Sequence, residues 1–227
     1  MKISHASGLN AALPAALPAS WQVHGPRPDL CILYGRAAVT TQSYGNHMGR
    51  LVPMPDSLVT ERLRLRPWKE TDAPKYRELW LERDPRSLRV VGPDGRPTVA
   101  DLCENIRSQR AATARTGIGL FAVERLDESR FIGYCGLVTR DATPDEPEIA
   151  FELLREVHGN GYATEAARSV RDAAAATGRS RLWAGVRVWN TASFRVLAKL
   201  GFVSSGRVDE DPERGDLVLM TCRLRVR

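Results

Sequence analysis

The chain has 227 residues, of which 43% are hydrophobic and 26% are charged, and its formal net charge is +6. This ordinary globular balance excludes a chain that is disordered throughout, and the length suits one domain with an extension. No apolar run is long enough to cross a membrane, so we expect no contact with a membrane interior.

Residues 1–55 differ in composition from the rest of the chain. They contain scattered Pro, Gly, Ser and Ala and no sustained apolar period. We therefore expect a mostly unstructured extension over residues 1–55, with one short strand at residues 30–35, and a folded domain over residues 56–227. Met48 and Met54 precede the ordered pattern, so our hypothesis is that the native chain starts at one of them or that the extension is dispensable.

The cysteines and the beginning of the chain indicate the compartment. No two cysteines are close enough for a C-x-x-C motif, so we expect free thiols and no metal site. Pro14 and Pro18 interrupt the beginning of the chain, which makes it a poor signal peptide. Both features favour a cytoplasmic protein. The cysteines are Cys31, Cys103, Cys135 and Cys222.

Residues 58–68 are predicted to form the first strand of the domain. Hydrophobic and basic side chains alternate along it, and Leu63 and Leu65 point to the same, buried face. The basic side chains on the opposite, exposed face are Arg62, Arg64 and Arg66.

Two helices are predicted next, joined by a turn at residues 92–97. The first covers residues 69–84, with Thr71 or Asp72 as its cap. The second covers residues 98–117, and Thr98 caps it. The residues predicted to point inward from the second helix are Val99, Leu102, Cys103 and Ile106.

The remaining elements alternate between strands and helices. Two strands joined by an acidic turn suit an antiparallel hairpin, and the last two strands form another. The complete order of strand, two helices, three strands, helix, strand, helix and two strands predicts one α/β domain with a mixed sheet. The predicted strands cover residues 119–126, 130–138, 148–154, 179–189, 202–208 and 216–227, and the helices cover residues 162–178 and 190–202.

Between a strand and a helix, residues 156–166 read Glu-Val-His-Gly-Asn-Gly-Tyr-Ala-Thr-Glu-Ala. Glycines at the start of a helix let an anion approach the unpaired N–H groups of its first turn. No Gly-Lys-Ser/Thr follows, so this is not a P-loop. A dinucleotide fingerprint is also excluded, because Thr164 replaces its third glycine and no acid lies between Asp172 and Asp209 to hold a ribose. The turn alone therefore leaves two interpretations, an anion site or a plain tight turn.

Two motifs together resemble a known family. Residues 148–170 resemble motif A of the GNAT N-acetyltransferases, whose core is Q/R-x-x-G-x-G/A and here reads His-Gly-Asn-Gly-Tyr-Ala over residues 158–163. Further along, Asn190-Thr-Ala-Ser193 opens a helix that ends in Lys-Leu-Gly-Phe202, as in the RimJ/RimL branch. The resemblance covers about residues 58 to 225. His158 departs from it, because the family has Gln or Arg there.

The resemblance implies the GNAT fold and its acyl donor. That fold is an α/β architecture with a mixed, mostly antiparallel central sheet, helices on both faces and central strands that splay apart. The implied donor is acetyl-CoA, with its pantetheine arm beside Leu153 and Leu154 and hydrogen-bonded to Asn190. The implied pyrophosphate site is the turn of His158, Gly159, Asn160, Gly161, Tyr162, Ala163 and Thr164.

The resemblance also implies direct attack of a primary amine on the thioester. Ser193 matches the family position near the thiol, so we expect it to donate a proton to the leaving thiolate. Glu148 matches a frequent family Glu and is the first candidate for the base, and Glu152 is the second. The structural alternatives are that Asn190 and Ser193 only begin a helix and that Glu148 is a surface acid.

The sequence is compatible with more than one kind of acceptor. The RimJ/RimL branch acetylates protein N-terminal α-amines, which makes such an amine our first expectation. A polyamine, an aminoglycoside or an amino acid is the alternative, with carboxylates drawn from residues 141–148 and 209–216. A non-catalytic acyl-CoA-binding module is a third interpretation. Scattered arginines without interleaved aromatics argue against nucleic acid as a partner. Homodimers occur in the branch, and the oligomeric state stays open.

Overall fold

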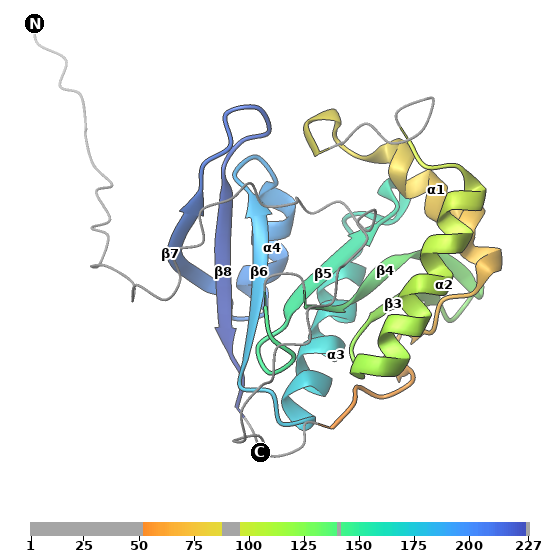
Figure 1. Cartoon of the computed structure of the whole chain (residues 1–227), viewed down its shortest axis with the longest axis horizontal. Helices are drawn as coiled ribbons and strands as arrows, with labels where there is room; N and C mark the ends of the chain where they lie inside the picture. Colours follow the sequence, from red (N-terminus) through yellow and green to blue (C-terminus); the bar gives the residue numbers. More distant parts are fainter. Residues whose placement is uncertain (1–51, 88–95, 140–141, 226–227) are drawn as a thin grey trace, which may run out of the picture.

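The computed structural model describes residues 52–87, 96–139 and 142–225. These residues build an eight-stranded sheet with the strand order β1-β2-β3-β4-β5-β6-β8-β7 (Figure 1). The predicted strand at residues 30–35 and the first four residues of the turn predicted at residues 92–97 lie outside the described residues. Among the described helices, none combines the length and apolarity that crossing a bilayer requires.

The strands and helices follow the predicted order. The strands are β1 (Leu58–Val59), β2 (Leu63–Arg66), β3 (Leu120–Arg125), β4 (Arg130–Val138), β5 (Glu148–Leu153), β6 (Arg181–Arg187), β7 (Val203–Asp209) and β8 (Leu217–Arg223). The α-helices are α1 (Ala73–Glu82), α2 (Val99–Thr116), α3 (Tyr162–Ala176) and α4 (Thr191–Lys199).

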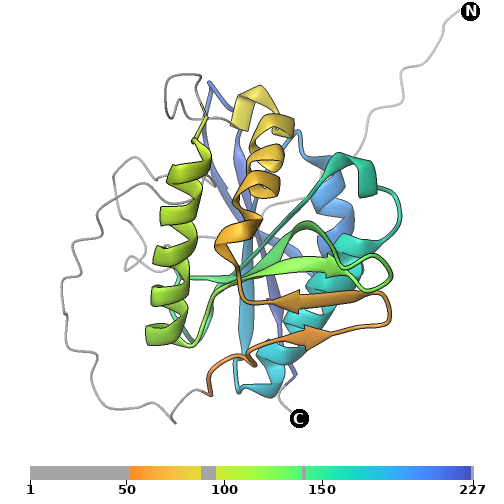
Figure 2. The ribbon, with the colours of Figure 1, turned by 90° about the vertical axis from the view of Figure 1, so that its right-hand side faces the viewer.

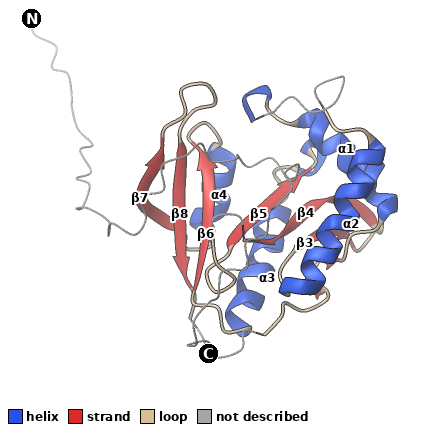
Figure 3. Ribbon diagram, viewed as in Figure 1, coloured by secondary structure: helices blue, strands red, loops and turns tan. Residues whose placement is uncertain are grey.

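Helices cover both faces of the sheet. Figure 2 shows α1 and α2 on one side of the strands and α3 on the other, and in Figure 3 α4 lies on the same side as α3. Every strand pair is antiparallel except β5 with β6, which is parallel. The prediction of a mixed, mostly antiparallel sheet between helices is confirmed.

The two central strands, β5 and β6, separate almost as soon as they meet. Their register contains one pair, Glu148 with Trp183, supported by a 3.0 Å hydrogen bond from the Trp183 N–H to the Pro147 carbonyl. Beyond this pair, the backbone groups along the facing edges of both strands have no partner strand within the described part of the chain. The predicted splay of the central strands is therefore present, and it creates a strand edge inside the molecule.

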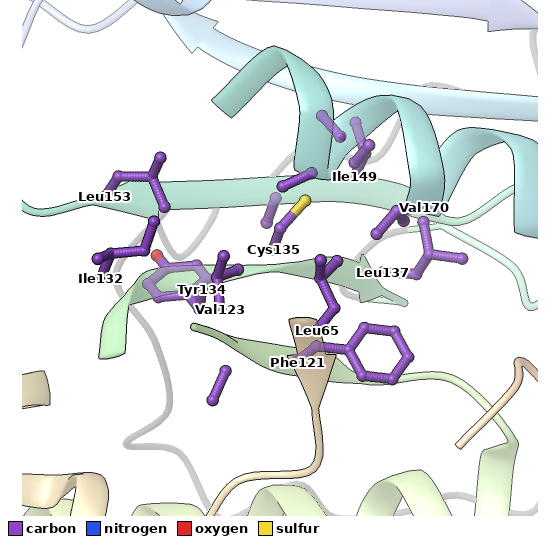
Figure 4. Close-up of a cluster of buried hydrophobic side chains, with 14 of the residues drawn as sticks. Leu65, Phe121, Val123, Ile132, Tyr134, Cys135, Leu137, Ile149, Leu153 and Val170 are labelled. Atoms are coloured by element: carbon purple, nitrogen blue, oxygen red, sulfur yellow. The ribbon is translucent and has the colours of Figure 1, made fainter. Parts of the chain in front are cut away.

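A hydrophobic core holds the diverging strands in place. Figure 4 shows side chains of β4 and β5, including Cys135, Leu137 and Ile149, gathered near Val170 of α3. Cys135, Leu137 and Val170 are completely buried. Burying a side chain of the size of Leu or Val contributes about 1.5–3 kcal/mol, so β4, β5 and α3 form a rigid unit on which the site can be built.

The first predicted strand is wrong in one respect, because residues 58–68 form a hairpin. β1 pairs with β2, and Leu58 lies opposite Leu65. Thr60 makes the turn by donating its N–H to the Leu63 carbonyl and accepting the Leu63 N–H on its hydroxyl. Arg66 was predicted to be exposed but is buried, because its guanidinium binds Asp72 at 2.8 Å and Glu124 at 2.8 Å.

The second helix follows the prediction except at its first residue. Thr98 and Asp101 cap α2 reciprocally, and Leu102 and Ile106 are buried as expected. Val99 is 41% exposed, because the first turn extends past the surface that the rest of the helix covers. The inward prediction for Val99 is therefore wrong.

Arg179 connects three separate segments from a buried position between α3 and β6. Its side chain is fully enclosed, and burial lowers the pKa of Arg179. It donates to the carbonyls of Pro144 at 3.0 Å and Val52 at 3.2 Å, and to the Thr177 hydroxyl. The Met54 N–H donates to the Gly117 carbonyl at 2.8 Å, so the chain from Val52 onward belongs to the fold.

Replacing Arg179 with Met should lower the free energy of unfolding by about 2–4 kcal/mol, because buried carbonyls lose their donors. Urea denaturation would measure the change. The matched control is Arg223→Met on β8, where the side chain is exposed. An Arg179→Met effect no larger than that of the control would contradict the structural role.

Candidate functional site

The diverging strands border a cavity of about 560 Å³. Its walls come from β5 and β6, the beginning of α3, the length of α4, the end of α1 and the loop between β7 and β8. Most of the residues predicted to bind the donor meet there. The predicted residues that line it are Glu152, Leu153, His158, Gly159, Gly161, Tyr162, Ala163, Thr164, Asn190 and Ser193.

The glycine turn presents bare backbone to this cavity. Gly159 and Gly161 both have φ of +81°, a left-handed conformation that favours glycine. A Cβ at Gly159 would meet nothing within 4 Å, so the space above it is open. Gly161 is the N-cap of α3 and no side chain caps the helix, which leaves the first-turn N–H groups facing an accessible space. The turn can therefore hold an anion such as a pyrophosphate.

His158 is held by the strand that precedes the turn. Its Nε2 lies 2.8 Å from the Leu153 carbonyl oxygen, so Nε2 carries the proton and donates it. The other ring nitrogen, Nδ1, remains available to bind another group. Where the family has Gln or Arg, this side chain attaches the turn to the end of β5.

A second attachment joins the turn to the first hairpin. Glu165, in the first turn of α3, accepts hydrogen bonds from the Thr60 hydroxyl at 2.6 Å, the Arg62 N–H at 2.9 Å and the Arg62 Nε at 2.7 Å. Burial raises the pKa of Glu165, but these donors outweigh it and hold the pKa below its usual value. The stability that Glu165 adds is present above its unfolded pKa and is lost as the pH falls. Sequence reasoning missed this contact, which joins residues far apart in the chain.

Asn160 shapes the turn through its own hydrogen bonds and is not part of the cavity wall. Its side-chain amide donates to the carbonyls of Val157 and His158, each at 3.2 Å. Its own carbonyl accepts from Arg62 Nη1 at 3.1 Å. Asn160 therefore supports the loop that carries the glycines.

The edge of β5 that faces the cavity is set by its pairing with β4. The Leu154 N–H donates to the Ile132 carbonyl at 2.9 Å, so it points away from β6 and is not available to a ligand. Because antiparallel strands alternate, the N–H of Leu153 points the other way, toward the gap. The structure therefore brings the Leu153 backbone to the cavity, while the buried Leu154 does not line it.

Glu148 lies where β5 and β6 begin to separate. Its Oε1 accepts the Gly185 N–H at 3.1 Å, which joins the two strands at their last point of contact. Gly185 lines the cavity and Glu148 does not, so the carboxylate sits at the edge of the cavity, at the narrow end of the gap.

Glu152 lies further out on the same strand face and is bound on both carboxylate oxygens. Arg83 donates from Nε to Oε1 at 2.7 Å and from Nη2 to Oε2. The Arg83 guanidinium also stacks 4.0 Å over the Trp80 ring. Tyr134 lies directly opposite Glu152, and burial and then the Glu152 charge raise the pKa of Tyr134 well above its usual value. Sequence reasoning missed Arg83 and Tyr134, because only the fold brings α1 and β4 to this carboxylate.

The beginning of α4 forms the wall opposite the glycine turn. Asn190 caps the helix by accepting the Ser193 N–H at 3.1 Å, as the structural alternative expected. Both side chains also belong to the cavity wall. Capping and ligand contact are therefore compatible, because the amide NH₂ of Asn190 is not used by the cap.

The cysteines lie away from the cavity. Within the described ranges Cys103, Cys135 and Cys222 are free thiols, and none of them lines it. Burial raises the pKa of both Cys135 and Cys222, which keeps them protonated and poor nucleophiles. The same ranges contain no group of His, Cys, Asp and Glu side chains suited to a metal ion.

The mouth of the cavity is bounded by the end of α1 and the β7–β8 loop. The Arg86 guanidinium lies 4.5 Å over the Trp189 ring, whose Nε1 donates to the Arg214 carbonyl at 2.6 Å. A hydrogen bond from Arg86 lowers the pKa of Asp84 to about 2, so that this acid stays charged. These contacts place an aromatic ring and paired charges at the opening.

Comparison with known proteins identifies the domain. The model of the family described as "Acetyltransferase (GNAT) domain" matches residues 62–203. The chain is 26% identical over 165 residues to an uncharacterized N-acetyltransferase p20 of Bacillus licheniformis, covering 72% of this chain and 92% of that protein. It is 31% identical over 147 residues to the uncharacterized protein YkkB of Bacillus subtilis (strain 168), covering 63% and 83%.

Solved structures share the fold. The ribosomal L7/L12 α-N-protein acetyltransferase RimL, solved with coenzyme A, superposes with a TM-score of 0.64 at 14% identity, covering 78% of this chain and 100% of that one. RimJ of Mycobacterium smegmatis, solved with CoA-disulfide, superposes with a TM-score of 0.59 at 24% identity, covering 71% and 81%.

Proposed function

Because this chain belongs to the acetyltransferase (GNAT) domain family, we propose that it transfers the acetyl group of acetyl-CoA to the α-amine of a protein N-terminus. The observation that carries the proposal is that a glycine turn, a free strand edge and the helix start at Asn190–Ser193 all line the same cavity. The enzyme class and the acyl donor follow from the family, and the acceptor is the proposed part.

The residues present fit acetyl-CoA along its length. Backbone N–H groups of Gly161 to Thr164 bind the pyrophosphate at the beginning of α3. The N–H of Leu153 donates to a carbonyl of the pantetheine arm, as it would to an added strand. The unused amide NH₂ of Asn190 bonds the same arm from the opposite wall.

When bound, acetyl-CoA supplies a thioester whose carbonyl carbon the amine nitrogen attacks, so that the C–S bond breaks and a C–N bond forms. Ser193 would donate its hydroxyl proton to the thiolate that leaves and would regain a proton from solvent. Glu148 accepts the proton that the amine must lose. Glu152 is the weaker candidate for this base, since Arg83 already occupies both of its oxygens.

The charges at the mouth favour a singly charged acceptor over a polycation. Two acids there have a basic partner in the fold: Asp84 binds Arg86 and Glu152 binds Arg83. Asp211, from the segment that an aminoglycoside pocket would need, is bound by both Arg187 and Arg214. Glu146, from the other such segment, is bound by Arg181 and Trp183.

The fold shared with RimL, a ribosomal L7/L12 α-N-protein acetyltransferase, supports a protein N-terminus as acceptor. Measuring kcat/KM for free N-terminal peptides, a polyamine, an aminoglycoside and single amino acids would test it. We expect a peptide to give the highest value. A small amine that exceeds every peptide would replace the proposed acceptor and leave the acetyl transfer intact.

Replacing Ser193 with Ala should lower kcat about 10- to 100-fold, because the thiolate then leaves without a positioned proton donor. The KM for acetyl-CoA should change little, since Asn190 and the glycine turn remain. Release of free thiol from acetyl-CoA would measure both constants. Thr191→Ala, at an exposed position beside it, is the control. An unchanged kcat would remove Ser193 from the catalytic step.

The free thiols support a reducing compartment, since Cys103, Cys135 and Cys222 form no disulfide within the described chain. A cytoplasmic location is the simplest setting for them.

A further inference from the structure

We propose that Arg195 and Lys199 of α4 bind the 3′-phosphate on the nucleotide end of acetyl-CoA. The inference rests on the proposed binding of acetyl-CoA and adds a binding site for the nucleotide end of that molecule. It assigns a ligand of stated chemistry, a phosphomonoester, to side chains that the glycine turn and the reacting groups leave unused.

The first observation is the position of the two side chains. Both line the same cavity as Ser193, and they lie one turn apart on α4. An α-helix rises 1.5 Å per residue, so Lys199 is roughly 9 Å further along the axis than Ser193. α4 thus carries the two cations along the cavity away from Ser193, Arg195 by about 3 Å and Lys199 by about 9 Å.

The second observation is that their charges are unused within the fold. Among the described residues, neither side chain makes an ion pair or a hydrogen bond, and both residues are exposed. The other arginines of the wall have partners: Arg83 pairs with Glu152, Arg187 and Arg214 pair with Asp211, and the Arg155 guanidinium donates to the backbone carbonyl of Glu82. Arg195 and Lys199 are therefore the two cations of the wall whose side chains have no partner among the described residues.

The chemistry of coenzyme A explains which group belongs there. Its pyrophosphate fits the backbone N–H groups at the beginning of α3, which need no side-chain cation. Its 3′-phosphate is a monoester that carries up to two negative charges near neutral pH. A planar guanidinium and an ammonium one turn apart suit such a group.

Lys199 can also stabilise the end of α4, and the experiment must separate this role from phosphate binding. It lies in the last turn of α4, where a cation is favoured by the helix dipole whether or not a ligand binds. Such a role changes the stability of the protein and not its choice between ligands. A comparison of ligands that differ only in the 3′-phosphate therefore isolates the proposed contact.

The experiment measures the dissociation constants of CoA and 3′-dephospho-CoA by calorimetry on the full chain. We expect the wild-type protein to bind CoA about tenfold more tightly, as two solvent-exposed ionic contacts allow. In Arg195→Ala/Lys199→Ala the two constants should become equal, and the one for 3′-dephospho-CoA should stay at the wild-type value. Arg195→Lys/Lys199→Arg should keep most of the preference.

The matched control is Arg110→Ala/Arg115→Ala on α2, which removes the same charge from exposed positions and includes a last-turn cation. It should keep the wild-type preference. A wild-type protein without preference, or an equal loss for both ligands in the α4 variant, would overturn the proposal. Failure of the proposed donor binding looks different, since neither ligand would then bind to any variant, and a different acceptor would leave all of these constants unchanged.

Discussion

Replacing Glu148 with Gln should lower kcat by about 10²- to 10⁴-fold, the range that a positioned general base contributes. Gln keeps an oxygen that can accept the Gly185 N–H, so the junction of β5 and β6 is preserved. It cannot take a proton from the attacking amine. The KM for acetyl-CoA should remain near its wild-type value, because the binding groups lie elsewhere in the cavity.

Glu152→Gln is the variant that decides between the two carboxylates. Like Glu148→Gln, this variant replaces a carboxylate of β5 with an amide, but it also removes an ion pair with Arg83. We expect a much smaller loss of kcat than for Glu148→Gln. If Glu152→Gln abolishes turnover and Glu148→Gln does not, the assignment of the base is reversed. Partial recovery of Glu148→Gln at higher pH, where more of the amine is already neutral, would support the assignment further.

Replacing Gly161 with Ala should weaken acetyl-CoA binding about 10- to 100-fold, the effect of losing one charge-assisted hydrogen bond. Gly161 has φ of +81° at the beginning of α3, and an added Cβ strains that conformation and displaces the N–H groups that face the anion. Calorimetric titration with acetyl-CoA would measure the change.

Gly178→Ala provides the control for backbone strain. Gly178 follows the other end of α3, has φ of +87° and leaves space for a Cβ. Both variants should lose similar stability, and only Gly161→Ala should lose affinity. Equal affinities in the two variants would remove the anion-binding role of the turn.

The sequence predicted the parts of the site that depend on local backbone. A glycine turn between a strand and a helix, and an Asn-x-x-Ser helix start, each determine a local geometry, and both line the cavity. The order of strands and helices likewise follows from hydrophobic periodicity and caps such as Thr98.

The sequence did not predict the contacts that depend on packing between distant elements. Arg66 reads as an exposed residue in an alternating strand, yet Asp72 and Glu124 neutralise it inside the protein. Arg83 ends a helix and Glu152 lies on a strand 69 positions later, so their ion pair appears only once α1 packs over the sheet. The direction of the Leu154 N–H could not be deduced either, because it depends on the register of β4 with β5.

Acetyl transfer to an N-terminal amine is tested most directly by identifying the acetylated product of a single reaction. The full chain is incubated with acetyl-CoA and a lysine-containing peptide whose N-terminus is either free or already acetylated, and released CoA and peptide mass are measured together. We predict that one CoA is released for each acetyl group found on the free N-terminus, and that the blocked peptide does not react. Equal acetylation of both peptides would place the acetyl group on the lysine side chain, and intact acetyl-CoA with peptides of varied N-terminal residues would contradict the claim altogether.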